Sequence, residues 1–270
     1  MLVRFHLKII EFGNNFEEQR ESLHEIENQL STADKRRVQA IFDKIQDIEN
    51  DLNTSLISLN VILKIGFNPQ HETCDRNAIN LPERVVLKSP TGKDVLCDTR
   101  TDGGGWILIM RRIQGGVNFS RPWTDYRNGF GLFDGDFWLG LEEVHTLSNA
   151  GQWELRVDMK FEGKDYYANY NTFKIDSETL FYTLHVGQFS GNVGDDLEYH
   201  DGIRFYTYDR PTVNHCARTY TGGWWYRDCH HCYLTGVWRS KDWAKGVHWD
   251  SLSTSGKNLD AAEMKIRKVN

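Results

Sequence analysis

The segment TDGGGWILIMRR, residues 101–112, says most about how this protein folds. The three glycines Gly103–Gly105 are a turn signal, because glycine adopts backbone angles that other residues avoid. The apolar run Trp106–Arg111 that follows is typical of a β-strand. Similar runs return at Trp153–Phe161 and Thr183–Val186, with glycine-containing turns between the runs. Short strands between irregular turns predict an α+β domain with an irregular antiparallel sheet.

The composition changes upstream of this segment and divides the protein into two parts. All nine Trp lie at or beyond Trp106, 21 of the 23 Gly lie at or beyond Gly92, and no Pro precedes Pro69. The change falls at Gly66–Thr73, where Gly and Pro end any helix. We therefore predict a leader at residues 1–12, a helical segment at 13–66, a linker at 67–73 and a globular domain at 74–270.

Apolar residues recur at helical spacing in the front part. Leu23, Ile26, Leu30 and Ala33 alternate steps of three and four, and the series resumes at Ile41 after one register slip. Such a stripe is often the buried face of an ordinary helix. Here, however, roughly 45 residues run without Pro or an internal Gly, far beyond the usual 8–20 of a globular helix. We predict a coiled-coil stalk that joins several chains, with the number of strands left open.

Charge and hydropathy speak against some partners and some cellular locations for this protein. The net charge is −6 and no basic stretch stands out, so we expect no nucleic-acid partner. No apolar run approaches the length of a membrane span. Met1–Ile10 is apolar but is interrupted by charged and polar residues at every second position, which makes it a poor signal peptide. The simpler interpretation is a frayed or strand-like leader.

The five cysteines suggest an oxidising compartment. Cys74 and Cys97 lie 23 residues apart, Cys216 and Cys229 lie 13 apart, and Cys232 is left over. Two alternatives stay open at this point. The cysteines with His215, His230 and His231 could hold zinc, and Cys229–Cys232 has the spacing of a redox motif. If the cysteines instead form the two local pairs, the leftover Cys232 is either a buried thiol or an intermolecular link.

Two glycosylation sequons also fit a secreted, extracellular protein. They are Asn53-Thr54-Ser55 and Asn118-Phe119-Ser120. A protein of this length carries such a triplet by chance, so neither sequon decides the compartment.

From Cys74 onward the sequence resembles the fibrinogen-related domain, the module found at the ends of fibrinogen chains, in ficolins and tachylectins, and in mollusc lectins. The resemblance rests on a series of motifs in family order, with both cysteine pairs at the family's spacing. These motifs are Thr101–Trp106, Arg111-Arg112, Asn118-Phe119, Trp123–Tyr126, Arg127–Gly131, Gly135–Gly140, Trp224–Tyr226 and Glu263–Arg267. The resemblance covers residues 74–270 and implies a fibrinogen C-terminal-like fold with disulfides Cys74–Cys97 and Cys216–Cys229.

The resemblance also implies a ligand pocket beside the second disulfide. In relatives a cis peptide bond before that bridge's second Cys shapes the pocket, which places the corresponding bond at Asp228–Cys229. Tyr220 and His230 match a pocket wall and its neighbour. Trp224, Trp225 and Tyr233 are further expected neighbours. The competing interpretation is that Tyr220 fills core and His230 holds a loop. Asp228 replaces a residue that is often basic or amidic in relatives, so we expect the pocket to disfavour anionic sugars.

Calcium is the cofactor that the resemblance implies, but its site is degraded in this sequence. Relatives carry an Asp-x-Asp pair upstream of the third Cys, whereas here Asp209 is followed by Arg210 and Pro211. Calcium takes six to eight oxygen ligands, several of them charged. Asp209 alone is weak support, so we expect calcium binding to be lost or much weakened.

These observations favour a secreted, multivalent lectin-like protein of innate immune recognition. Its partners would be glycans or acetylated groups on cell or microbial surfaces, with self-association through the stalk. The alternative is a protein- or peptide-binding module that uses the same domain. We expect no enzyme, because the sequence holds no nucleophile elbow, phosphate loop, dinucleotide fingerprint or zinc-protease motif.

Overall fold

A computed structural model describes Lys44, Cys74, Arg76 and residues 81–210, 215–253 and 257–269. The protein divides into two units at Asn68–Pro69, and the strands and helices with described bounds all belong to the second unit. The leader at 1–12, the coiled-coil stalk at 13–66 and the linker at 67–73 lie outside the described residues, Lys44 apart. Those boundaries stay predictions.

The second unit consists of short strands with few helices, as the sequence predicts for an α+β domain. The strands are β1 (Arg84–Lys88), β2 (Asp94–Asp98), β3 (Trp106–Arg112), β4 (Phe130–Gly131), β5 (Phe137–Trp138), β6 (Trp153–Phe161), β7 (Lys164–Ile175), β8 (Leu184–Gly191), β9 (Cys232–Tyr233), β10 (His248–Trp249) and β11 (Ala261–Lys268). The helices are α3 (Trp123–Asn128), α4 (Leu141–Ser148) and α5 (His215–Tyr220), with 3₁₀ turns at Thr101–Gly103, Glu178–Leu180 and Glu198–His200.

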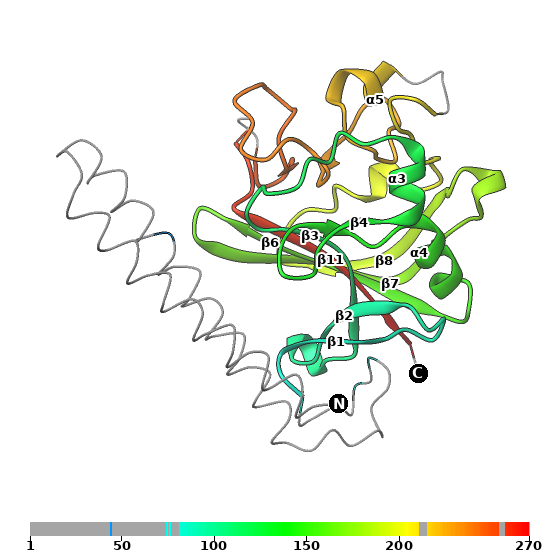
Figure 1. Ribbon diagram of the computed structural model, residues 1–270. Helices are drawn as coiled ribbons and strands as arrows, with labels where there is room; N and C mark the ends of the chain where they lie inside the picture. Colours follow the sequence, from blue (N-terminus) through cyan, green and yellow to red (C-terminus); the bar gives the residue numbers. More distant parts are fainter. Residues whose placement is uncertain are drawn as a thin grey trace, which may run out of the picture. The chain divides into compact units, whose positions relative to one another are not determined.

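One large antiparallel sheet organises the domain (Figure 1). Its order is β1-β2-β3-β11-β6-β7-β8, and the β4–β5 pair joins it at β3. The last strand in the sequence, β11, lies in the middle, paired with β3 on one side and β6 on the other. The sheet is therefore complete only once this late strand has been inserted, which makes its pairing strongly non-local.

The predicted strands agree with those observed. β3 covers the run after the triple glycine, β6 has the predicted bounds Trp153–Phe161, and β8 begins one residue after Thr183 and continues to Gly191. A two-residue turn joins β6 to β7, with φ of 48° at Glu162 and 76° at Gly163. Positive φ at both central residues matches the twist of the flanking strands, which is why this hairpin closes tightly.

Side chains of β6 alternate between two environments. Trp153, Leu155, Val157 and Met159 are buried in the apolar core. The residues between them face the other side of the sheet, because successive side chains of a strand point to opposite faces. The sheet thus has one apolar face and one face that carries charged side chains.

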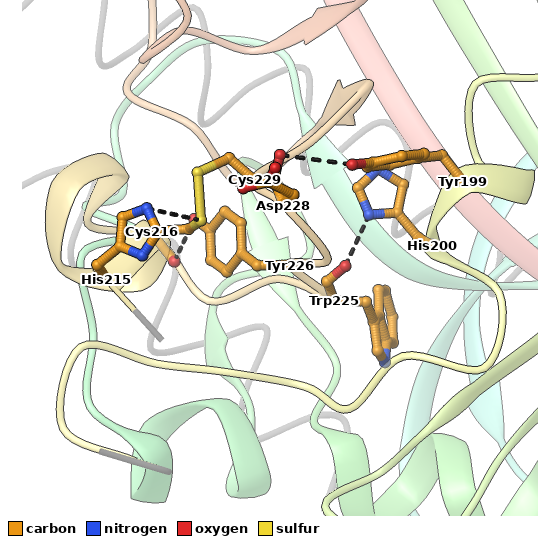
Figure 2. The surroundings of a disulfide bond; sticks show 9 residues. Tyr199, His200, His215, Cys216, Trp225, Tyr226, Asp228 and Cys229 are labelled. Atoms are coloured by element: carbon orange, nitrogen blue, oxygen red, sulfur yellow. Dashed lines mark hydrogen bonds between the residues drawn. A yellow bond between two sulfur atoms is a disulfide. The ribbon is translucent and has the colours of Figure 1, made fainter. Parts of the chain in front are cut away.

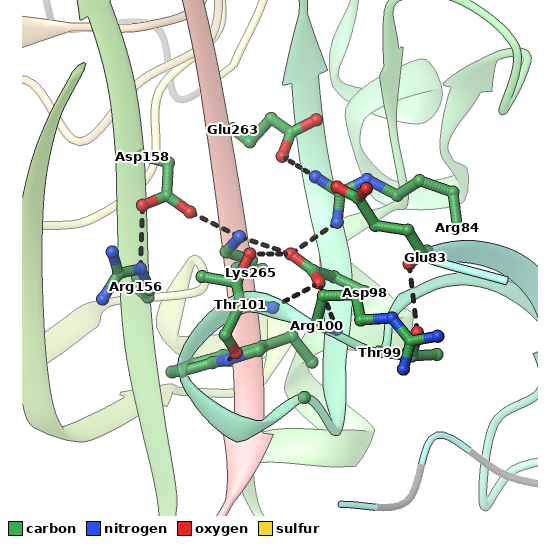
Figure 3. A network of polar contacts seen from close by, with 12 residues as sticks. Glu83, Arg84, Asp98, Thr99, Arg100, Thr101, Arg156, Asp158, Glu263 and Lys265 are labelled. Carbon is green, nitrogen blue, oxygen red and sulfur yellow. Dashed lines mark hydrogen bonds and ion pairs between the residues drawn. The ribbon is translucent and has the colours of Figure 1, made fainter. Parts of the chain in front are cut away.

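A buried ion network lies on the charged face (Figure 3). The Lys265 ammonium of β11 lies 2.7 Å from Asp98 Oδ2 and also pairs with Asp158 of β6, and Lys265 and Asp98 are both fully buried. Burial raises the pKa of Asp98, but the Lys265 charge and hydrogen bonds from Lys265 and Thr101 outweigh it and hold that pKa well below the usual range. This network ties β2, β6 and β11 together.

The segment between β8 and β11 is mostly irregular and lies on one side of the sheet (Figure 1). It contains α5 and the two-stranded ladder of β9 with β10. An irregular segment needs other restraints to hold one conformation, and the second disulfide supplies one of them. The candidate site lies in this segment.

Candidate functional site

Both predicted disulfides are present. Cys74 is bonded to Cys97, which is in β2, and Cys216 of α5 is bonded to Cys229, with Cα atoms 5.2 Å apart (Figure 2). Tyr220 follows Cys216 by four residues on α5, a spacing that places both on one face of a helix. The bridge therefore holds the Tyr220 face of α5 against the Cys229 loop.

A cavity of about 420 Å³ opens beside this bridge. Four of the predicted site residues line it: Tyr220, Asp228, Cys229 and His230. The remaining lining residues come from the segment that leads into and follows β10. They are Trp243, Ala244, His248, Asp250 and Ser253.

The other three predicted site residues lie behind the cavity wall. Trp224, Trp225 and Tyr233 are each at most 1% exposed, and none is among the lining residues. The Tyr233 hydroxyl accepts a hydrogen bond from the Gly222 N–H at 2.7 Å and donates one to the Tyr220 carbonyl at 2.9 Å. Tyr233 thus supports the turn that carries Tyr220.

His230 is the most distinctive group of the cavity. Its ring stacks on Tyr233, with centroids 4.8 Å apart, and meets Tyr220 edge-on at 4.4 Å. Both ring nitrogens are buried, and neither has a hydrogen-bond partner within the described part of the protein. Burial, followed by the neighbouring His248 and His200, lowers the pKa of His230 to about 3. At neutral pH the ring therefore offers one N–H donor and one nitrogen acceptor, both unused.

His248 and Asp250 form the opposite part of the lining. The register of the short ladder pairs His248 with Tyr233, which brings this later segment to the cavity. His248 Nδ1–H donates to the Gly246 carbonyl at 3.0 Å, and its Nε2 lies 3.6 Å from a carboxylate oxygen of Asp250. Burial lowers the pKa of His248 even though Asp250 opposes that change.

The charge of the cavity follows from these groups. Its described lining holds two carboxylates, Asp228 and Asp250, and neither Lys nor Arg. The histidines His230 and His248 are held neutral by burial. The cavity is therefore negative at neutral pH, which disfavours an anionic ligand.

His200 holds the loop that carries His230 through three hydrogen bonds, of which Figure 2 shows the one to the Trp225 carbonyl. It is fully buried; its Nδ1 lies 2.6 Å from the Trp225 carbonyl, and its Nε2 accepts the backbone N–H groups of His231 and Cys232 at 3.3 and 3.4 Å. These partners require a neutral ring with the proton on Nδ1. Burial lowers the pKa of His200 to about 4.

The zinc and redox alternatives do not fit the structure. His215, Cys216 and Cys229 do lie close together, but both cysteines are consumed in the disulfide and offer no thiolate. Cys229 pairs with Cys216 and not with Cys232, so the Cys-x-x-Cys spacing is not a redox pair. Cys232 is a free thiol, fully buried, and burial raises its pKa well above the usual value.

Asp209, the degenerate calcium ligand, is engaged elsewhere. Its Oδ1 accepts hydrogen bonds from the Trp123 N–H at the start of α3, at 3.0 Å, and from Thr207 Oγ1, at 2.7 Å. The Arg210 guanidinium next to it lies over the Trp123 ring at 4.6 Å and pairs with Glu178 at 2.9 Å. Residues 211–214 lie outside the described residues. One oxygen of Asp209 is thus already occupied by two donors, which weakens Asp209 as a calcium ligand.

No helix within the described ranges is long and apolar enough to cross a membrane.

Comparisons with known proteins agree with this geometry. The family model described as fibrinogen beta and gamma chains, C-terminal globular domain, matches residues 82–269, which is more than half of this protein. Human tenascin-R is 40% identical over 179 residues, which are 65% of this chain and 13% of tenascin-R. Human Fibrinogen C domain-containing protein 1 is 44% identical over 192 residues, which are 67% of this chain and 42% of that protein. The match thus spans less than half the length of either relative.

Solved structures give the same result. The fibrinogen-like globe domain of human ANGPTL6 matches with a TM-score of 0.68 and 36% identity, covering 72% of this chain and 93% of that domain. A lamprey fibrin D-dimer in complex with the peptide Gly-His-Arg-Pro-amide matches with a TM-score of 0.63 and 24% identity, covering 97% of this chain and 93% of that one. At that identity the likeness to the lamprey protein concerns the fold alone.

Proposed function

The chain belongs to the family of fibrinogen C-terminal globular domains, and we propose that its domain is an extracellular binding module, not an enzyme, whose cavity beside Cys216–Cys229 binds N-acetylated glycans. The observation that carries this proposal is the pair of unused, buried nitrogens on His230. A buried polar group without a partner costs free energy, and a ligand that supplies the partner recovers that cost.

An acetamido group matches this environment. After a small movement of the His230 ring, whose nitrogens are covered in the free protein, the carbonyl oxygen accepts the His230 N–H, while the methyl packs against the aromatic rings of Tyr220 and Trp243. Trp243 is 76% exposed, so its ring covers a ligand at the rim without being needed in the core. The cavity volume lies in the range that ligand sites occupy.

The negative lining restricts which acetylated glycans bind. Asp228 and Asp250 repel a carboxylate, so sialic acid is a poorer ligand than neutral N-acetylglucosamine. A single small cavity gives weak binding, and several domains on one stalk would raise the avidity by roughly 10²–10⁴. In this proposal the protein is a secreted recognition protein of innate immunity, and its predicted coiled coil serves to join several domains so that they bind together.

Retention of the full-length protein on N-acetylglucosamine resin, with elution by the free sugar, tests the proposal. Tyr220→Ala and His230→Ala remove one aromatic wall and the donor, and each is expected to abolish retention. The matched control is Tyr208→Ala, because Tyr208 is an exposed tyrosine outside the cavity lining. Flow-through of the wild-type protein, or equal retention of all variants, would refute glycan binding at this cavity.

The two carboxylates favour a second candidate ligand, a peptide with a free N-terminal amine. Asp228 and Asp250 could pair with the ammonium group in the same cavity. A short peptide with a free N-terminus and its N-acetylated form distinguish the two candidates in a calorimetric titration. Binding of the free amine alone supports the peptide module, whereas binding of the acetylated form alone supports acetyl recognition.

A further inference from the structure

The loop between β3 and α3 presents an asparagine on a fixed support. Phe119 is 3% exposed; its ring packs edge-on against Phe130 at 4.9 Å, and the Arg112 guanidinium lies over it at 4.0 Å. Asn118, the preceding residue, is exposed. The loop is thus anchored by the middle residue of the triplet Asn118-Phe119-Ser120 while the first residue faces solvent.

The carboxamide of Asn118 is oriented by its own backbone. Its Oδ1 accepts the Ser120 N–H at 2.9 Å, which directs the carbonyl end of the side chain inward. The amide nitrogen Nδ2 makes no hydrogen bond within the described part of the protein. The carbonyl of Asn118 accepts from Arg121 Nε at 2.9 Å, which fixes the backbone as well. The nitrogen is therefore unengaged and accessible.

A hollow of about 330 Å³ lies beside this side chain. Trp238 and Val237 form one wall of it, and the glycines before Asn118 form part of the other. The Trp238 ring packs directly on Gly115, where an added Cβ would stand 2.1 Å from the indole. An aromatic face next to an exposed asparagine is a surface on which a sugar ring can stack.

We propose that Asn118 is an N-glycosylation site and that the first sugar of its glycan lies in the hollow against Trp238. Both disulfides require an oxidising compartment, which in a eukaryotic cell is the one where such transfer takes place. The donor is an oligosaccharide linked to a lipid diphosphate. Asn118 Nδ2 forms a bond to the anomeric carbon, the bond from that carbon to the diphosphate oxygen breaks, and the proton lost from Nδ2 goes to the departing lipid diphosphate.

The glycan would stand next to the candidate ligand cavity without entering it. Val237 of the hollow is joined to the later part of the same loop, because its N–H donates to the Lys245 carbonyl at 2.8 Å. Trp243 and Ala244 of that loop line the ligand cavity. The loop at residues 237–246 therefore separates the glycan from the ligand, and loss of the glycan leaves retention on sugar resin unchanged.

Peptide mapping of the full-length protein, secreted from eukaryotic cells behind a cleavable leader, tests the modification. Trypsin releases Ile113–Arg127, because cleavage before Pro122 is blocked, and this peptide holds no other sequon. We expect the peptide to carry a glycan, and enzymatic removal in heavy-oxygen water to leave labelled aspartate at position 118. Ser120→Ala abolishes the label and Ser120→Thr retains it. An unmodified peptide from secreted, disulfide-bonded protein would overturn the proposal.

The position of the first sugar is tested separately by two glycosidases. One enzyme leaves the first N-acetylglucosamine on Asn118, and the other removes it and converts the residue to aspartate. We expect the melting temperature to be about 2–4 °C lower for the second product, the shift that a modest packing contact causes in a domain of this size. The second product also carries a new carboxylate at position 118, so the matched control is Ser120→Ala, whose Asn118 is neither glycosylated nor charged, and it should melt with the second product. Equal melting of both products would overturn the stacking on Trp238.

Discussion

Acid should loosen the site through His200. This residue is fully buried, and its Nε2 accepts the backbone N–H groups of His231 and Cys232. A proton on Nε2 would replace an acceptor with a donor that faces two donors. The experiment therefore lowers the pH from 7 to 5 for two proteins, the wild type and His200→Gln. The variant lacks the group that takes up the proton.

The size of the effect follows from the two pKa values of His200. Burial lowers the pKa to about 4 in the folded protein, against 6.5 for an unperturbed histidine. The unfolded state therefore binds more protons, so this contribution to stability is complete above about pH 6.5 and is lost as the pH falls towards 4. The whole loss is roughly 3 kcal/mol, of which about 2 kcal/mol falls between pH 7 and pH 5.

Urea unfolding followed by tryptophan fluorescence measures this loss. The window above pH 5 is chosen because carboxylates, such as the strongly paired Asp98, lose their charge only at lower pH. His200→Gln should be less stable than wild type at pH 7, by about 1–3 kcal/mol, since it loses part of the hydrogen bonding. The difference between the two proteins should shrink by about 2 kcal/mol at pH 5.

The control is His215→Gln, which changes an exposed histidine that does not contact His200 and should lose as much free energy of unfolding between pH 7 and pH 5 as the wild type. If wild type and His200→Gln lose the same free energy of unfolding between pH 7 and pH 5, His200 does not titrate as its burial requires. His230, with its pKa lowered to about 3, adds a similar loss in both proteins and cancels in the comparison.

Three further predictions concern the framework of the domain. Lys265→Met should lower the free energy of unfolding by about 3 kcal/mol, because it removes the buried ammonium that Asp98 shares with Asp158 and leaves Asp98 only its ion pair with Arg84; a loss below about 1 kcal/mol in urea unfolding would contradict this. Replacing Cys216 and Cys229 together by Ala should cost about 2–4 kcal/mol and abolish retention on sugar resin, and a variant with full retention would show that the bridge does not frame the cavity. Millimolar calcium or a chelator should leave the melting temperature unchanged, since Asp209 already accepts two hydrogen bonds, and calcium-dependent stabilisation in scanning calorimetry would disprove it.

Local sequence was sufficient wherever a short segment determines its own structure. The bounds of β6 were predictable because apolar and polar residues alternate along it. The disulfide between Cys216 and Cys229 was predictable from the family spacing, and the same resemblance placed Tyr220 and His230 beside it.

The aromatic residues show where local pattern is insufficient. Trp224, Trp225 and Tyr233 have the same chemistry as a ligand wall, but they are buried and lie behind the cavity. Core and ligand walls both consist of aromatic rings, so residue type does not separate the two roles. Only the packing of the folded protein around each ring separates them.

Sequence alone was thus enough for the family, the α+β class, the two bridges and one side of the cavity. The other side depends on the tertiary fold. Trp243, His248 and Asp250 reach the cavity because β10 pairs with β9, and that ladder joins segments whose own residues carry no signal for each other. The fold also sets the charge of the site, because burial, which depends on the whole domain, keeps His230 neutral beside two carboxylates.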